Sequence, residues 1–325
     1  MKKGTLIYNP VAGQRPAGRQ REVRRAADFL RQAGLEVDLA PTQRPDMAHE
    51  LAQAAVAEGA DVVFACGGDG TINEVVNGLA LGGVPLAILP GGTANILARE
   101  LRLPLNPVRA ARQFAHWTPR RIALGRARWK QISPGAPASE SAPQERCRYY
   151  TSVAGVGYDA YVVYKLSSWL KERLGVTGYV LEALRQWALY TFPRFTCRLD
   201  GRERQATFAV IHRTRLYAGW LHLAPTADLF TPHLAVCSFP SRSRLRYLLY
   251  AVAVLARQHL RLQDVTLDQC TEAVCTALDS CTPLYFELDG ELVGALPAKF
   301  EIVPDARTVM VPGKNRSQES EVRSQ

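Results

Sequence analysis

Carboxylates stand at two points of the chain where their spacing suggests chemistry. Asp289 and Glu291 lie two residues apart in LDGELVG (288–294), and Asp69 lies in GGDGT (67–71). A carboxylate can accept a proton from a hydroxyl group or contact a divalent cation. Asp289 and Glu291 would share one face of an extended strand, but a glycine turn between them would alter that. LDGRE (199–203) shows that LDG also suits an ordinary hairpin, so both interpretations of LDGE stay open.

The glycine-rich turn around Asp69 follows an apolar run and precedes an amphipathic one. Glycines let backbone N–H groups converge on a phosphate near a helix N-terminus. The segment is neither the P-loop, which needs G-K-[ST], nor the dinucleotide fingerprint G-x-G-x-x-G. Either the turn binds phosphate, or it is a connector in which Asp69 caps a helix.

Two other loops repeat this design. In PGGTAN (90–95), Gly91 and Gly92 predict a tight turn, Thr93 a helix cap and Asn95 an amide offered to a ligand. NPVAG (9–13) follows the first predicted strand. Three such loops at one sheet edge would enclose the phosphates and ribose of a nucleotide.

The first third of the chain alternates between strand and helix patterns, which predicts a parallel sheet with helices on both sides. The predicted strands are 4–9, 35–41, 60–66 and 84–90, and the predicted helices are 18–34, 46–59, 71–82 and 93–101. In such a sheet, ligands bind at the carboxyl ends of the strands, where these loops lie.

From about residue 121 the pattern becomes mostly β with some helix. The strands predicted there are 121–132, 148–158, the runs within 195–212, 233–239, 264–270, 284–294 and 298–305, with a helical stretch at 159–190. Residues 308–312 are predicted to return to the first domain as a strand, 133–145 to form a mobile loop, and 313–325 to be disordered. The expected domains are therefore 1–120 with about 305–312, and 121–304.

The amino-acid composition limits the classes of binding partner to expect. The 325 residues include 47% hydrophobic and 22% charged residues and carry a net charge of +10, which favours anionic partners. No Arg/Lys run interleaved with aromatics predicts nucleic-acid binding. Seven scattered cysteines without C-x-x-C spacing indicate small buried side chains in a reducing cytosol.

Neither a signal peptide nor a membrane span is predicted. The longest apolar run, LLYAVAVLA (248–256), lies between Arg246 and Arg257 and is far shorter than the ~20 residues of a spanning helix. We therefore expect a cytoplasmic protein, with peripheral contact at the acidic inner face of the membrane. The aromatic side chains of 159–192 form either core packing or an apolar groove for a lipid.

Taken together, the motifs resemble the diacylglycerol kinase catalytic-domain family, which includes sphingosine kinases and bacterial soluble lipid kinases. The matching segments, in the family's order, are NPVAG (9–13), Thr42, GGDGTINEVVNGL (67–79), LPGGTANILARELRLP (89–104), GVGYDA (155–160) and LDGE (288–291). GGDGT alone is shared with NAD kinases, whereas the two longer segments together are typical of lipid kinases.

The resemblance implies an α/β nucleotide-binding domain, similar to that of NAD kinases, followed by a β-sandwich. It implies ATP with Mg²⁺, and transfer of the γ-phosphate to a lipid alcohol such as diacylglycerol or a sphingoid-type alcohol. By the same resemblance, Asp289 and Glu291 supply the catalytic carboxylate, with Asp69 as a further candidate. The residues expected to border the nucleotide are Asn9, Pro10, Val11, Ala12, Gly13, Thr42, Gly67, Gly68, Asp69, Gly70, Thr71, Ile72, Asn73, Gly92, Thr93 and Asn95.

The chain departs from this family at one place. Many bacterial relatives carry a structural magnesium site with a pattern like AP-x-A-x-x-D-D-G-x-L-D-V, whereas this chain has APTADLFTPHLAV (224–236), in which only Asp228 remains. We expect no structural metal there. An NAD kinase and a non-catalytic lipid- or nucleotide-binding relative stay as alternatives, and a homodimer is one candidate assembly.

Overall fold

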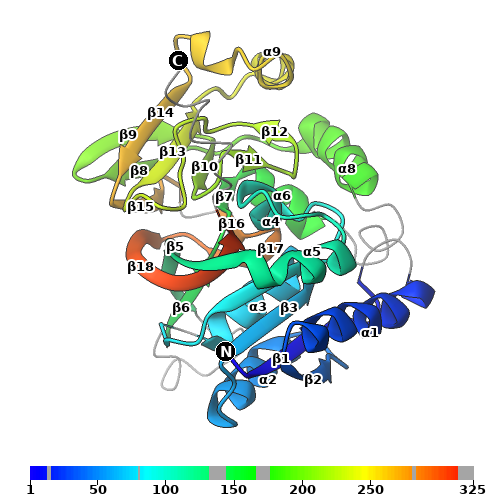
Figure 1. The fold of residues 1–325 in the computed structure, drawn as a ribbon. Helices are drawn as coiled ribbons and strands as arrows, with labels where there is room; N and C mark the ends of the chain where they lie inside the picture. Colours follow the sequence, from blue (N-terminus) through cyan, green and yellow to red (C-terminus); the bar gives the residue numbers. More distant parts are fainter. Residues whose placement is uncertain (13–15, 80, 132–143, 166–175, 280–282, 314–325) are drawn as a thin grey trace, which may run out of the picture. The chain divides into compact units, whose positions relative to one another are not determined.

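The computed structural model describes residues 1–12, 16–79, 81–131, 144–165, 176–279 and 283–313. Gly13, Cys281, most of the predicted 133–145 loop and the tail beyond residue 313 lie outside these ranges. The chain divides into two compact units, Met1–Ile122 with Arg307–Gln325 (unit 1) and Ala123–Ala306 (unit 2). Strands β5 (Trp117–Gln131) and β18 (Ala298–Pro312) continue from one unit into the other (Figure 1).

Unit 1 is built on a parallel sheet with the strand order β2-β1-β3-β4-β18. Its other elements are β1 (Lys3–Tyr8), α1 (Pro16–Gln32), β2 (Glu36–Pro41), α2 (Met47–Ala57), β3 (Val62–Gly67), α3 (Asp69–Leu79), β4 (Leu86–Pro90), α4 (Ile96–Glu100), α5 (Pro107–Gln113) and a 3₁₀ turn at Phe114–His116. Every residue of β3 and β4 is buried, as expected for strands covered on both faces. The predicted α/β domain is confirmed.

Helices cover both faces of this sheet. α1 packs against α5, and α2 packs against α3. Right-handed crossovers place α1 on the opposite face from α2 and α3. The inner side of α1 is apolar at the spacing of a helix, since Val23, Ala26, Ala27 and Leu30 are all fully buried.

Unit 2 contains two antiparallel sheets that share a core. One sheet has the order β14-β13-β10-β7-β16-β17, and in the other β18 pairs with both β5 and β15. The strands not yet bounded are β6 (Gln144–Tyr150), β7 (Val153–Gly157), β8 (Phe195–Leu199), β9 (Arg202–Ala206), β10 (Phe208–His212), β11 (Leu216–Tyr217), β12 (Leu221–His222), β13 (Leu234–Phe239), β14 (Thr266–Cys270), β15 (Glu272–Ala277), β16 (Tyr285–Leu288) and β17 (Glu291–Ala295). One buried cluster combines residues of both sheets, such as Phe195 and Phe286, which confirms the β-sandwich.

Three helices of unit 2 lie within the described residues: α6 (Tyr158–Lys165), α8 (Val176–Leu189) and α9 (Arg244–Leu255). A 3₁₀ turn follows α9 at His259–Arg261. Tyr190 and Phe192 are buried in an aromatic cluster with Tyr247 and Tyr250 of α9, so core packing accounts for these rings. Of the other aromatics predicted in 159–192, Tyr164 is 45% exposed and Trp169 lies outside the described residues.

Several predicted elements differ from the structure. Residues 148–158 form two strands rather than one, because Thr151 and Ser152 separate β6 from β7, which belong to different sheets. Residues 298–312 form one strand, which pairs antiparallel with β15 and, at Val309, parallel with β4. α5 and β15 were not predicted, and α4 is shorter than the predicted helix 93–101. The differences among the strands arise where long-range pairing outweighs local pattern.

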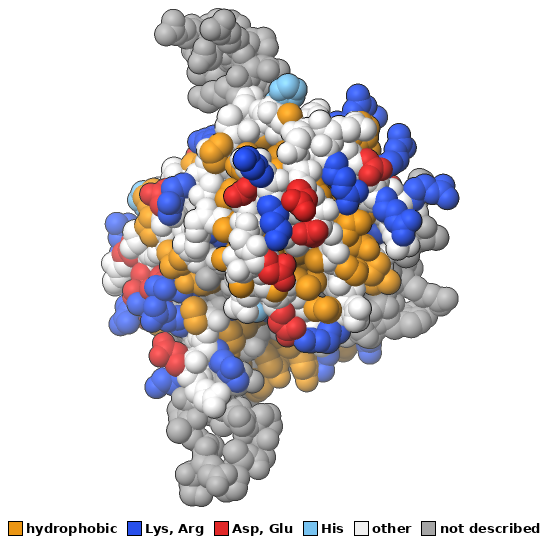
Figure 2. Space-filling view, turned by 60° about the horizontal axis from the view of Figure 1, so that its bottom comes forward, with side chains coloured by type: hydrophobic (Ala, Val, Ile, Leu, Met, Phe, Trp, Pro, Cys, Tyr) orange, Lys and Arg blue, Asp and Glu red, His pale blue; other side chains and the backbone are white. Residues whose placement is uncertain are grey.

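No described helix is both long and apolar enough to cross a membrane. Of the cysteines that the structure describes, Cys147 is exposed and the other five are buried. On the face drawn in Figure 2, Lys and Arg side chains are interspersed with acidic and hydrophobic ones.

Candidate active site

Four loops follow the carboxyl ends of β1, β2, β3 and β4, at one edge of the unit 1 sheet. They contain Asn9–Ala12, Thr42, Gly67–Gly70 and Gly91–Asn95. The Asn9 side chain accepts from Val11 N (3.0 Å), which makes the tight turn after β1. Thr42 N donates to Tyr8 O (2.8 Å) and fixes the start of the second loop. The structure thus brings these predicted nucleotide-binding segments of unit 1 to the edge where such sheets bind ligands.

The Asp69 carboxylate joins the third and fourth loops. Its Oδ2 accepts from Asn95 N (2.9 Å) and its Oδ1 from Ile96 N (2.7 Å). Asp69 therefore caps α4, a helix distant in sequence. The sequence had suggested instead that Asp69 would cap the helix that directly follows the glycine turn, which is α3. Predicting Thr93 as a helix cap was wrong, because the N-cap position belongs to Asn95 and Thr93 is exposed.

Close contact between the two glycine turns explains their composition. Gly91 N donates to Gly67 O (2.8 Å), and a Cβ on Gly92 would lie 2.4 Å from the Gly68 Cα. The Asn95 amide closes its own turn, accepting from Gly92 N and donating to Gly92 O, both at 2.9 Å. Only glycine lets the two backbones approach so closely.

Arg19, in α1, was not among the predicted site residues. It is 6% exposed, and its guanidinium donates to Ala12 O (3.1 and 3.2 Å) and to Gly91 O (2.5 Å). One buried cation therefore holds the first loop against the fourth. Sequence offered no signal for it, because Arg19 is one of several arginines along the same helix.

The remaining predicted nucleotide-binding residues of unit 1 differ in how far their side chains are buried. Val11 is 71% exposed, whereas Ile72 is fully buried and Asn73 is 1% exposed. The Ile72 side chain packs in the core, and Ile72 N donates to Gly68 O (3.1 Å), so it supports the turn. Thr71 is also buried and contacts Gly67. Contact with a nucleotide is therefore best supported for the loop backbone.

In unit 2, LDGE forms the hairpin turn between β16 and β17. Asp289 and Gly290 have φ values of 51° and 85°, as a type I′ turn requires. The Asp289 carboxylate accepts four hydrogen bonds, from Thr151 N (2.8 Å), Thr151 Oγ1 (3.0 Å), Ser152 N (2.8 Å) and Val153 N (3.0 Å). Asp289 thus ties the turn to the β6–β7 connection.

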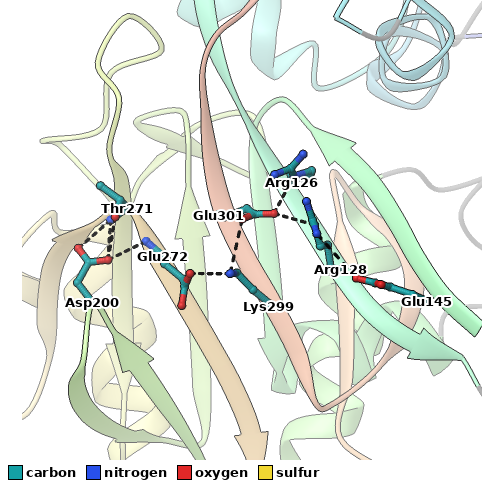
Figure 3. Close-up of polar contacts among 8 residues, drawn as sticks. All are labelled: Arg126, Arg128, Glu145, Asp200, Thr271, Glu272, Lys299 and Glu301. Carbon is teal, nitrogen blue, oxygen red and sulfur yellow. Dashed lines mark hydrogen bonds and ion pairs between the residues drawn. The ribbon is translucent and has the colours of Figure 1, made fainter. Parts of the chain in front are cut away.

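The second LDG turn has the same geometry. Asp200 and Gly201 have φ values of 44° and 88°, and the Asp200 carboxylate accepts from Thr271 N, Thr271 Oγ1 and Glu272 N. Figure 3 shows Asp200 beside a row of ion pairs that runs from Glu272 through Lys299 and Glu301 to Arg126 and Arg128. The bonds made by Asp289 are therefore those of a structural turn that this chain uses twice.

Glu291 begins β17, directly after the turn. Its carboxylate is 33% exposed and pairs with Arg148 of β6 (Nη2 to Oε2, 2.5 Å). Of the two predicted catalytic residues in LDGE, Glu291 is the one with fewer backbone bonds and more solvent contact. Because this carboxylate is partly exposed and does not hold the turn, it can accept a proton without loss of the turn.

A second carboxyl pair lies buried beside this turn. Glu287 is 1% and Asp159 4% exposed, and a Cβ on Gly155 would lie 2.6 Å from Glu287 Oε1 and 2.4 Å from Asp159 Oδ2. Glu287 accepts from Gly155 N (2.7 Å) and Gly290 N (2.5 Å), and Tyr179 donates to Asp159. Burial, with Asp159 adding to it, raises the pKa of Glu287 well above its ordinary value, and burial also raises the pKa of Asp159.

Asp159 lies in the GVGYDA segment, but the sequence analysis did not predict that it pairs with Glu287. A Glu inside the otherwise apolar strand segment LYFEL was the available signal, because a buried charge needs a partner.

The segment 224–236, which departs from the relatives' metal-binding pattern, is held by a guanidinium. Arg213 is fully buried and donates to the carbonyls of Asp228 (3.0 Å), Thr231 (3.1 Å) and His233. Asp228 caps its own turn through Phe230 N (2.9 Å). Within the described ranges, no group of three or more His, Cys, Asp or Glu side chains is arranged to hold a metal ion.

Comparison with known families matches both units. Residues 3–127 match the model described as diacylglycerol kinase catalytic domain. Residues 152–311 match the model described as YegS C-terminal NAD kinase beta sandwich-like domain. The two matches together extend over most of the chain.

Curated relatives match over nearly the full length. A protein named diacylglycerol kinase from Bacillus subtilis (strain 168) is 28% identical over 306 residues, which cover 92% of this chain and 93% of that protein. A protein of the same name from Mycobacterium tuberculosis (strain CDC 1551 / Oshkosh) is 29% identical over 316 residues, or 95% of each chain.

A solved structure shares the fold. The crystal structure of a protein titled diacylglycerol kinase from Bacillus anthracis str. Sterne superposes with a TM-score of 0.70 at 20% identity, over 98% of each chain.

Proposed function

We propose that the lipid substrate of this chain is diacylglycerol. The chain belongs to the diacylglycerol kinase catalytic-domain family and is an ATP-dependent lipid kinase. The choice of lipid is supported by the names of relatives that align over 92–95% of the chain. Peripheral contact with an acidic membrane surface is part of the proposal, because such a substrate resides in a bilayer.

The nucleotide is assigned to unit 1. Backbone N–H groups of Gly68 and Gly70 suit phosphate oxygens, because this turn ends a strand of the parallel sheet and opens helix α3. The main support for placing the nucleotide in unit 1 is that the Asp69 carboxylate holds the two glycine turns together. Asp69 is the carboxylate in these loops that would hold Mg²⁺ carried with ATP, and the ion would neutralise phosphate charge there.

Glu291 is assigned as the general base and Asp289 as a positioning residue. The hydroxyl proton of the lipid passes to Glu291, the hydroxyl oxygen bonds to the γ-phosphorus, and the bond from that phosphorus to the β-phosphate oxygen breaks to release ADP. Asp289 holds the turn that presents Glu291, through its four hydrogen bonds.

Transfer of labelled γ-phosphate to diacylglycerol in detergent micelles tests the proposal. Wild type should label the lipid, and Glu291→Gln should lower kcat by about 10²–10⁴-fold, the usual contribution of a general base. Glu203→Gln, in the hairpin with the second LDG turn, is the matched control and should keep wild-type activity.

Each other outcome has a defined meaning. Full activity of Glu291→Gln would exclude Glu291 as the general base and leave the kinase assignment standing. Labelling of NAD instead of lipid would replace the proposed substrate. Labelling of no acceptor by a wild-type protein that binds ATP would refute the proposed function.

A further inference from the structure

The outer face of α9 is an apolar surface with nothing packed on it among the described residues. Its exposed side chains, here called the α9 stripe, are Leu245 (76% exposed), Leu248 (40%), Leu249 (42%), Val252 (61%) and Leu255 (59%). They recur at helical spacing, so they share one side of the helix. The opposite side packs inward through Tyr247, Tyr250 and Ala253, each at most 7% exposed.

α9 therefore has two apolar faces, of which the fold uses one. A helix that is apolar all round is normally buried or within a membrane. Twelve residues rise only about 18 Å, well short of the roughly 30 Å hydrocarbon core of a bilayer. Such a helix can lie in the plane of a membrane surface but cannot span it.

Charge around the α9 stripe points to an anionic partner. Residues 242–261 contain five arginines and no acidic residue. Arg246 pairs with Asp264 (Nε to Oδ2, 3.0 Å), which leaves four exposed arginines at the two ends of the helix: Arg242, Arg244, Arg257 and Arg261. An apolar stripe with arginines at its ends matches acyl chains below and anionic headgroups around them.

We propose that α9 docks this protein onto an anionic bilayer surface, with the α9 stripe inserted among the acyl chains and the flanking arginines on the headgroups. The inference rests on the proposed function in one respect, namely that a lipid substrate places the enzyme at a bilayer. A second copy of the chain is disfavoured as occupant, because antiparallel pairing of two α9 helices would bring arginine clusters of like charge together.

Vesicle sedimentation without ATP tests the docking directly. Wild type should bind phosphatidylcholine vesicles that contain about 30% phosphatidylglycerol, and bind pure phosphatidylcholine weakly. Val252→Glu should lower the partition coefficient about tenfold or more, because burial of the valine is replaced by a charge. Val56→Glu, the same change on the exposed side of α2 (40% exposed), is the control and should bind like wild type.

Neutralising the arginines separates charge from insertion. Arg244→Gln with Arg257→Gln should lower binding to anionic vesicles about 30-fold, at roughly 1 kcal/mol per arginine, and should leave the weak binding to neutral vesicles unchanged. Equal thermal unfolding of these variants and wild type would establish that the fold is intact.

Activity in micelles keeps this inference distinct from the proposed function. Val252→Glu should phosphorylate short-chain diacylglycerol in detergent micelles within about twofold of wild type, since the side chain is 61% exposed on the outer face of α9 and is not part of the LDGE turn. It should lose activity on diacylglycerol in vesicles in proportion to binding. Vesicle binding without phosphorylation of any lipid would refute the function alone.

Three results would overturn the docking. They are failure of wild type to bind anionic vesicles, binding by Val252→Glu equal to wild type, and a concentration-dependent dimer in ultracentrifugation that Val252→Glu abolishes while vesicle binding persists. The last result would assign the α9 stripe to contact between copies.

Discussion

Asp289 and Asp200 occupy equivalent positions in two hairpins. Comparing them shows which features of Asp289 stabilise the turn and which could serve catalysis. Both have positive φ, and both carboxylates accept backbone N–H groups from the start of a neighbouring strand. The geometry of Asp289 is thus explained by the turn alone. The LDGE turn differs from the LDGR turn in its neighbouring carboxylates. Glu291 follows Asp289 in the chain, and the buried Glu287 precedes it.

The Glu287–Asp159 pair predicts a stability that depends on pH. Burial raises the pKa of Glu287, so folding favours its protonated form. That contribution is complete below the ordinary pKa of a glutamate and is lost as pH rises toward the raised value of the folded state.

Glu287→Gln should therefore flatten the pH profile of the unfolding temperature as the pH rises above the ordinary pKa of a glutamate. A glutamine can still accept one N–H bond and can donate to Asp159, so the variant should fold. Glu203→Gln serves as control and should keep the wild-type slope in thermal unfolding followed by circular dichroism. Parallel profiles for Glu287→Gln and wild type would show that Glu287 is ionised in the fold.

At the scale of elements, the two glycine turns of unit 1 act as one structure. Gly92→Ala places a Cβ 2.4 Å from the Gly68 Cα, so the turns must separate. We expect ATP affinity to fall about tenfold, the effect of an overpacking penalty of 1–3 kcal/mol in the phosphate loops. Isothermal titration measures it, with Gly83→Ala as control, because nothing lies within 4 Å of a Cβ there. Unchanged affinity in Gly92→Ala would remove these turns from the nucleotide site.

The 224–236 segment gives a second prediction at this scale. Burial lowers the pKa of Arg213 to about 10, so the guanidinium stays protonated at neutral pH. Arg213→Met leaves three carbonyls without this donor and should reduce the free energy of unfolding by about 3 kcal/mol or more. The exposed Arg202→Met should change it little.

Chelation tests the same segment without mutation. Because a side-chain cation already holds these carbonyls, EDTA should leave the unfolding temperature of wild type unchanged. A clear drop with EDTA, restored by Mg²⁺, would indicate a metal that stabilises the fold.

For the whole molecule, the net charge of +10 and the α9 stripe make separable contributions to membrane binding. Basic side chains are dispersed among acidic ones on the face in Figure 2, so charge attraction from that face is diffuse. Raising NaCl from about 50 mM to about 500 mM should weaken binding to anionic vesicles, because salt screens such attraction over a few ångströms. Wild type should keep a salt-resistant fraction in sedimentation assays, and Val252→Glu should not. Binding independent of salt would rule out the charge contribution.

The sequence by itself determined the architecture and the location of the loops. Alternating strands and helices predicted the parallel sheet, and the LDG and GGDG segments marked turns, because these depend on residues adjacent in the chain. The expected domain ends, near residues 120 and 304, can be set beside the unit ends in the structure, Ile122 and Ala306.

Only the tertiary structure decided which side chain meets which backbone. Asp69 caps a helix 27 residues away, Arg19 reaches Gly91, and Glu287 meets Asp159 from another element. Such contacts join residues far apart in the chain, so no local pattern encodes them. The same holds for α9, whose apolar run was plain in the sequence, whereas the choice of which face to bury depended on the aromatic cluster beneath it.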